Sequence, residues 1–196
     1  MRELLVATTN PGKLREISRI LQRVPVELKT LGDFPHVAIA EETGASFGEN
    51  ARQKAIHYAA ASGMVTLAED SGFEVEALNG EPGIHSARYL GDDATYDERF
   101  ADIYQRVRDS GSTDRSARFV CALTVADGLD VLFETTARVE GVLAEAPAGS
   151  NGFGYDPIFF YPPYGKTFGE VTDEQKSEVS HRGQAMRALR SYLLRR

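Results

Sequence analysis

The sequence is short of several features that would assign it to a special class of proteins. It has no apolar run long enough to cross a membrane, and its opening residues, MRELLVATTN, lack the apolar core of a signal peptide. A cytoplasmic protein without membrane partners is therefore expected. Basic residues are also few, since 22 lysines and arginines stand against 29 acidic residues, which gives a net charge of -7. This balance argues against a general nucleic-acid-binding protein.

Cysteines and repeats are scarce as well. Cys121 is the only cysteine, so a disulfide within the chain is excluded, and its place in FVCALTV predicts a small buried hydrophobic residue. No internal repeat, low-complexity tract or long linker divides the chain. With 196 residues, 42% of them hydrophobic, the sequence predicts one domain over 1–196 with a sizeable core.

Predicted helices recur along the chain. Apolar residues at helical spacing follow a short strand at 3–7. A second helix is predicted over 46–63, because a Ser-x-x-Glu capping box begins it and a glycine ends it. A third is predicted over 95–109. Thr172 with Gln175 would cap a short helix before a last helix closes the chain.

Predicted strands lie between these helices. The segment MVTLA is strand-like, the acidic EDSG after it is typical of a turn, and FEVEAL alternates as a half-exposed strand does. The segments 116–127 and 130–144 flank a tight connection, which predicts an antiparallel hairpin. PIFFY, at 157–161, is a further strand. A hairpin among alternating strands and helices predicts an α/β fold with a mixed, twisted sheet.

The loop ATTNPGK joins the first predicted strand to a helix and has features that suit a phosphate. It offers backbone N–H groups at a helix N-terminus, hydroxyls from Thr8 and Thr9, and the ammonium of Lys13. It is not a Walker loop, because it lacks the earlier glycine and the final hydroxyl of that motif. The alternative is structural, with Asn10 and Pro11 capping and beginning the helix and Lys13 in solvent.

Two adjacent acids, Glu69 and Asp70, form the second candidate feature. In EDSG they suit either a surface turn or a metal-dependent site, because a hard cation needs oxygen ligands on a stiff support. Taken alone, the motif favours the turn.

Two later segments could bind a nucleoside. In NGFGYDP, two glycines permit unusual backbone angles, and Phe153 and Tyr155 offer flat faces on which a purine could stack. The alternative is a turn whose aromatic rings serve the core. In KSEVSHR, Lys176, His181 and Arg182 could donate hydrogen bonds to a base, or they could form a solvated basic face.

Together these segments resemble the inosine triphosphate pyrophosphatase family, which hydrolyses non-standard purine nucleoside triphosphates. The resemblance runs from end to end of the chain. It rests on five motifs in order: TTNPGK, EETGASFGENARQKA, EDSG with PGIHSARY, FGYDPIF and SHRGQA. The chain departs from the commonest pattern at Thr9, where many members have glycine.

The resemblance implies cleavage between the α and β phosphates, to a nucleoside monophosphate and pyrophosphate, with Mg²⁺ as cofactor. Asp70 stands where the family has its proton acceptor. Glu41, Glu69 and Asp70 are implied as metal ligands, and Glu42 is an adjacent alternative to Glu41. Ser71 is implied as a substrate contact.

The resemblance also assigns the substrate contacts. Lys13, with the metal, would neutralise charge that develops on the phosphoryl oxygens. The triphosphate would be held by Thr8, Thr9, Asn10, Pro11, Gly12 and Lys13. The nucleoside would be held by Phe153, Gly154, Tyr155, Asp156, Lys176, His181 and Arg182.

For architecture, the resemblance implies an elongated mixed sheet with helices on both sides, two lobes with a central cleft, and a homodimer. Two other functions stay open. One is a related pyrophosphatase that acts on pyrimidine or modified nucleotides, and the other is a nucleotide-binding protein without catalysis. The retention of Glu41, Glu69, Asp70 and Lys13 together argues against the second.

Overall fold

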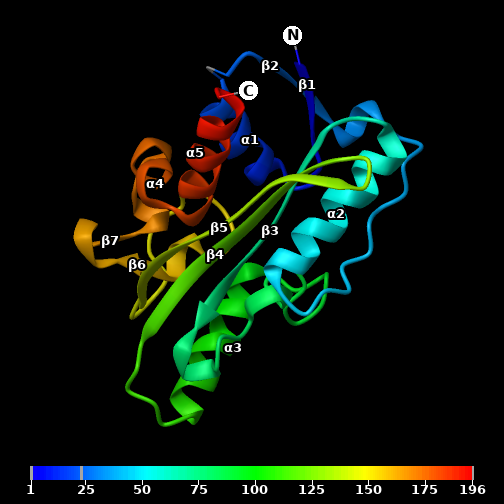
Figure 1. Ribbon diagram of the computed structural model, residues 1–196. Coiled ribbons are helices and arrows are strands. Elements are labelled where there is room, and N and C mark those ends of the chain that lie inside the picture. The colour runs from blue at the N-terminus through cyan, green and yellow to red at the C-terminus, as the bar shows by residue number, and fades with distance from the viewer. Residues whose placement is uncertain (1, 23, 196) are drawn as a thin grey trace. The chain divides into compact units, whose positions relative to one another are not determined.

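The computed structural model describes residues 2–22 and 24–195, which form seven strands, five α-helices and short 3-10 turns (Figure 1). The strands are β1 Arg2–Val6, β2 Val26–Thr30, β3 Thr66–Val75, β4 Ser116–Asp127, β5 Asp130–Leu143, β6 Phe159–Tyr161 and β7 Lys166–Thr167. The α-helices are α1 Pro11–Leu21, α2 Phe47–Ser62, α3 Tyr96–Asp109, α4 Asp173–Val179 and α5 His181–Leu193.

The strands form one sheet in the order β2-β1-β3-β4-β5-β6-β7. β1 is parallel to both β2 and β3, whereas β6 is antiparallel to β5 and to β7. The predicted hairpin is present, since two residues join the neighbouring strands β4 and β5. The prediction of an α/β fold with a mixed sheet is confirmed.

The chain divides into two compact units, and strands β3, β4 and β5 contribute residues to both. Unit 1 comprises the chain up to Asp70, the segment Cys121–Ala137 and the chain from His181 on. Unit 2 comprises Ser71–Val120 and Arg138–Ser180. Within the described chain, unit 1 contains two clusters of buried apolar residues and unit 2 contains one.

In unit 1, helices cover both faces of the strands. Successive side chains of a strand point to opposite faces, so neighbouring residues pack against different helices. Leu4 and Val6 of β1 belong to a core with residues of α1 and α5, whereas Leu5 between them belongs to a core with residues of α2. Although α1 and α5 come from opposite ends of the sequence, they lie side by side (Figure 1). Neighbouring residues of these strands therefore face different helices.

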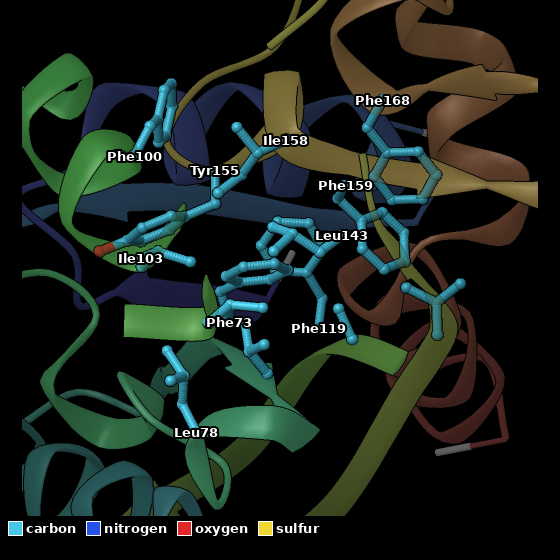
Figure 2. Packing of buried hydrophobic residues seen from close by; sticks show 14 of the residues in the cluster. Phe73, Leu78, Phe100, Ile103, Phe119, Leu143, Tyr155, Ile158, Phe159 and Phe168 are labelled. Atoms are coloured by element: carbon cyan, nitrogen blue, oxygen red, sulfur yellow. The ribbon is translucent and has the colours of Figure 1, made fainter. Parts of the chain in front are cut away.

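The core of unit 2 is rich in aromatic side chains (Figure 2). Phe73 stacks on Tyr155 with ring centroids 5.3 Å apart, and Phe119 meets Phe159 edge-on at 4.9 Å. Tyr155 is therefore a core residue, which is the structural alternative left open for NGFGYDP. The half-buried Phe153 lies outside this cluster of buried residues.

The predicted turn at EDSG is wrong. Glu69 and Asp70 lie inside the ten-residue strand β3, which continues without a break into Phe73 and Val75. Both of these apolar side chains are fully buried and Glu74 between them is partly exposed, so this end of the strand alternates as predicted. Turn-forming residue types predicted a turn locally, but β3 lies in the sheet between β1 and β4, and the sheet hydrogen bonds decide the conformation.

The predicted helix ends are confirmed, with one difference in detail. The Ser46 hydroxyl accepts from the Glu49 N–H, and Gly63 ends α2 in the left-handed conformation. The Glu49 carboxylate accepts from Ala45, not from Ser46, so the capping box is only half formed. At the start of α4, Thr172 and Gln175 form the full box. PIFFY is strand only over its last three residues, Phe159–Tyr161.

Candidate active site

The two adjacent acids of β3 point to opposite faces of the sheet. Glu69 contacts residues of α1 and α5, whereas Asp70 contacts residues of α2. The neighbours Leu67 and Ala68 divide in the same way between the two cores of unit 1. Glu69 and Asp70 therefore contact two separate groups of side chains, one on each face of the sheet.

Glu69 is the centre of a buried ionic network. Its two oxygens accept from Nε and Nη2 of Arg182 at 2.8 and 3.0 Å, and Nζ of Lys13 lies 3.1 Å from Oε1. The Sγ of Cys121 donates to Oε2 at 2.9 Å. Arg182 also donates to Glu16 of α1 at 2.6 Å. This network joins β3, α1 and α5 into one charged cluster inside unit 1.

The cluster keeps Glu69 ionised. Burial alone would raise the pKa of this carboxyl, but the charges of Arg182 and Lys13 outweigh burial and hold the pKa well below its ordinary value. Burial and the same carboxylate raise the pKa of the Cys121 thiol, so Cys121 stays a neutral donor. Glu69 therefore holds two cationic side chains, those of Arg182 and Lys13, in place.

This arrangement predicts an acid-sensitive fold. The pKa of Glu69 is lower in the folded chain than the ordinary value of 4.5, so its ionised form stabilises the protein above about pH 4.5. That contribution is lost as the pH falls from 4.5 toward the folded-state pKa. We expect Glu69→Gln to be less stable than the parent near neutral pH and to lose less stability on acidification. Urea unfolding between about pH 3 and pH 7 measures this, and equal pH dependence in the two proteins would contradict it.

Asp70 is held from the other face. Its Oδ2 accepts from Nδ2 of Asn50 at 3.1 Å, and its Oδ1 accepts from Nζ of Lys54 at 3.1 Å. Lys54 also donates to Glu42 at 2.8 Å. Burial alone would lower the pKa of Lys54, but the charges of Asp70 and Glu42 outweigh it and raise the pKa. A lysine held in its charged form thus connects two carboxylates.

The first loop lies where β1 ends beside β3, since the Ala7 N–H donates to the Leu67 carbonyl. Asn10 caps α1, with its side-chain oxygen accepting from the Gly12 and Lys13 N–H groups, and Pro11 begins the helix. The structural alternative for these two residues is thus confirmed. Lys13 is not a solvated lysine, because it is paired with Glu69.

A second candidate group lies in unit 2, around the loop NGFGYDP. Nζ of Lys176 is 2.5 Å from Oδ2 of Asp156, and the same oxygen accepts from the Phe153 N–H at 2.8 Å. Nζ also lies 4.6 Å from the centre of the Phe153 ring. Lys176 and Asp156 are both buried. The ion pair therefore fixes the loop that presents the Phe153 ring.

The two glycines of this loop allow a matched test. Gly152 and Gly154 both have positive φ, 72° and 66°. A Cβ on Gly152 would come within 2.0 Å of Asp156 Oδ2, whereas a Cβ on Gly154 would only reach Tyr96 at 3.6 Å.

We expect Gly154→Ala to lower the free energy of unfolding by about 1 to 2 kcal/mol, from backbone strain alone. Gly152→Ala should cost clearly more, because it displaces the carboxylate that holds Lys176. Equilibrium unfolding in urea compares the two variants. An equal loss would mean that Asp156 moves aside without consequence.

Other predicted site residues lie at different places in the chain and differ in exposure. Glu41 is exposed, and Glu42 beside it makes the contact with Lys54. Ser71 is half-buried in β3. His181 is buried at the start of α5, in unit 1, whereas Lys176 belongs to unit 2.

Sequence reasoning did not identify four residues of these networks: Glu16, Asn50, Lys54 and Cys121. Asn50 and Lys54 were recognisable in part, since their spacing of four places them on one face of the predicted helix. Nothing in the local sequence indicates that this face meets Asp70.

Asp70 is contacted by two nitrogen donors, Nδ2 of Asn50 and Nζ of Lys54, and the nearby acid Glu42 shares the second of them. Within the part of the chain that the structure describes, no three acidic, histidine or cysteine side chains could hold a metal by themselves. Magnesium needs fewer, because it is commonly bound by one or two carboxylates with substrate phosphates and water. Glu42 and Asp70 both contact Nζ of Lys54, so one ammonium bridges these two carboxylates.

The fold and the geometry thus define an α/β protein in which the loop after β1 begins beside a strand with two buried carboxylates, each held by its own set of partners. The family model described as the Ham1 family matches residues 4–192. The chain belongs to the Ham1 family.

Relatives and solved structures agree with this assignment. A dITP/XTP pyrophosphatase of Thermus thermophilus is 48% identical over 189 residues, which are 95% of this chain and 89% of that protein. One of Syntrophobacter fumaroxidans is 47% identical over 183 residues, 93% of this chain and 78% of that protein. The solved structure of a HAM1 protein from Coxiella burnetii matches with a TM-score of 0.92 and 37% identity over all of both chains. The family match covers residues of both units.

Among the described residues, no helix is both long enough and apolar enough to span a membrane.

Proposed function

We propose that the protein is a nucleoside triphosphate pyrophosphatase that converts dITP, ITP and XTP to the nucleoside monophosphate and pyrophosphate. The observation that carries the proposal is the division of Glu69 and Asp70 between two networks, beside a loop suited to phosphate. The full-length similarity to proteins named dITP/XTP pyrophosphatase supports the substrate class. The reaction clears non-standard purine nucleotides from the nucleotide pool.

Asp70 is the proton acceptor in this proposal. Water attacks phosphorus, the bond between the α and β phosphates breaks, and the proton of the water passes to Asp70. An oriented carboxylate suits this role, because general-base catalysis requires the base to lie within hydrogen-bond reach of the proton it removes. Lys54 and Asn50, one on each oxygen, support a fixed orientation of this carboxylate.

Mg²⁺ is the proposed cofactor, and it would supply positive charge that neutralises the phosphoryl oxygens as the bond breaks. Asp70 and the acids at 41–42 are the residues proposed to hold it. Glu69 points to the other face of the sheet and is paired with Arg182 and Lys13, so we assign it to the anchoring of these cations. Its direct contact with the metal stays a prediction of the sequence.

Lys13 is proposed to hold the β or γ phosphate, with its ammonium kept near the loop by Glu69. We expect Lys13→Ala to weaken binding of the triphosphate substrate more than binding of the monophosphate product. The reason is that the product has neither of these phosphates. Inhibition constants of inosine monophosphate and KM values of inosine triphosphate measure the two effects, and equal weakening would place Lys13 elsewhere.

Choice of the base is proposed to rest on hydrogen-bond donors. Hypoxanthine and xanthine have an oxygen at the purine 6-position, whereas adenine has an amino group that can only donate there. Lys176, His181 and Arg182 are the donors that the sequence predicts, and Phe153 is the ring for stacking. Because an unpaired buried donor costs about 1 to 3 kcal/mol, rejection of ATP is expected.

Initial rates of pyrophosphate release with Mg²⁺ test the proposed substrate class. Faster turnover of ITP, dITP and XTP than of ATP, dTTP and UTP is expected. Preference for dTTP or UTP would instead identify a pyrimidine nucleotide pyrophosphatase, and binding without turnover would identify a nucleotide-binding protein.

A homodimer in the cytoplasm is the proposed state of the enzyme.

A further inference from the structure

Helix α2 presents two polar side chains to Asp70, one helical turn apart. Lys54 is one of them, and its partners are the two carboxylates already described. Asn50 is the other, and it is fully buried within unit 1. A buried amide is stable only when both of its ends have hydrogen-bond partners. Asn50 therefore needs an acceptor near its Nδ2 and a donor near its Oδ1.

Asn50 joins two parts of the candidate site. Its Nδ2 donates to Asp70 Oδ2 at 3.1 Å, and its Oδ1 accepts from the Gly44 N–H at 2.8 Å. The amide cannot be turned around, because the Gly44 N–H can only donate and an ionised carboxylate can only accept. Asn50 thus connects the loop that carries Glu41 and Glu42 to the proposed base.

The approach of this loop to Asn50 is close. A Cβ on Gly44 would lie 2.7 Å from Asn50 Oδ1 and 2.9 Å from the Asn50 backbone N. Only glycine therefore lets the loop come near enough for its N–H to reach the amide. The loop, Asn50 and Asp70 form a chain of contacts with little freedom.

We propose that Asn50 is a positioning residue: its Oδ1 is fixed by the Gly44 N–H, and its Nδ2 holds the Asp70 carboxylate in its reactive orientation. This inference rests on the proposed pyrophosphatase reaction. Lys54 holds the other oxygen, so loss of Asn50 frees Asp70 to turn about its last bond without removing its charge. Turnover should then fall while substrate binding is largely kept.

The chain offers a matched control on the same helix. Gln53 also links α2 to the loop, since its Oε1 accepts from the Thr43 N–H at 3.3 Å. Gln53 is exposed and has no hydrogen bond to Asp70. Asn50→Ala and Gln53→Ala each remove an amide between helix and loop, but only the first removes a contact with the proposed base.

Steady-state kinetics with dITP and Mg²⁺ test the inference. We expect Asn50→Ala to lower kcat roughly 10- to 100-fold, the range for residues that orient ligand groups, with KM changed much less. Gln53→Ala should keep the parent kcat. Asn50→Asp, which retains an acceptor for Gly44 but not the donor to Asp70, should lose kcat as well. Circular dichroism and thermal unfolding establish that each variant is folded.

A double variant separates positioning from a general loss of structure. In an Asp70→Asn background, Asn50→Ala should cause little further loss of kcat, because a residue that acts through Asp70 has nothing left to position. Independent losses that multiply, or a parent kcat in folded Asn50→Ala and Asn50→Asp, would overturn the inference. A parent protein that does not release pyrophosphate from dITP would overturn the proposed function, and this role with it.

Discussion

Asp70→Asn should lower kcat for dITP by roughly 10² to 10⁴, the loss typical of a general base. The amide keeps the size of the carboxylate but cannot accept a proton from water. Its oxygen can still accept from Lys54 or Asn50, so the fold of unit 1 should be retained. Nucleotide affinity should change only modestly, because the role proposed for Asp70, that of a general base, acts chiefly in the transition state.

Pyrophosphate release measures kcat, and competition with a slowly turned-over nucleotide measures affinity. Glu74→Gln is the matched control, because Glu74 lies on the same strand and its carboxylate accepts from Arg118 in unit 2. This variant should keep the parent kcat. An Asp70→Asn variant that is folded and turns over dITP at the parent rate would exclude Asp70 as the base.

The second large effect concerns Arg182, whose side chain is fully buried between two carboxylates. We expect Arg182→Met to lower the free energy of unfolding by about 3 to 5 kcal/mol. Methionine keeps much of the apolar stem but leaves Glu69 buried with less compensation. Lys13 alone would then face that carboxylate.

Removing both partners provides the control. The double variant Arg182→Met, Glu69→Gln should be more stable than Arg182→Met alone, because no uncompensated buried charge is left at position 69. Urea unfolding near neutral pH compares the proteins. A single variant as stable as the parent would show that the ion pair does not contribute to the fold.

The same substitution tests the sequence-based prediction that Arg182 contacts the base. In the described structure its guanidinium donates to Glu69 and Glu16. If it also recognises the purine 6-oxygen, kcat/KM should fall more for inosine triphosphate than for ATP. An unchanged ratio would leave Arg182 with the anchoring role alone.

The sequence predicts local structure well where local contacts decide it. The caps at Ser46 and Thr172, the end of α2 at Gly63 and the β4–β5 hairpin depend on residues a few positions apart. The unusual backbone angles predicted at Gly152 and Gly154 are likewise present, since both have positive φ.

EDSG shows where such reasoning ends. Asp, Ser and Gly favour a turn when they are judged alone, but β3 passes through them because it lies between two other strands of the sheet, and partners elsewhere in the chain satisfy both carboxylates. Arg182 is 113 positions from Glu69, and Cys121 is 52 positions from it. Nothing in the local sequence indicates that Glu69 contacts residues so far along the chain. It also does not indicate that Glu69 faces α1 and α5 whereas Asp70 faces α2. The motif resemblance implied catalytic and metal-binding roles for the two acids, but it did not indicate that they point to opposite faces.

The most direct test of the account is the identity of the products from dITP. We predict that the protein with Mg²⁺, followed by phosphorus NMR, yields deoxyinosine monophosphate and pyrophosphate in equal amounts, and that Asp70→Asn yields neither at a comparable rate. Release of orthophosphate with deoxyinosine diphosphate, or no turnover of dITP by the folded parent protein, would contradict it.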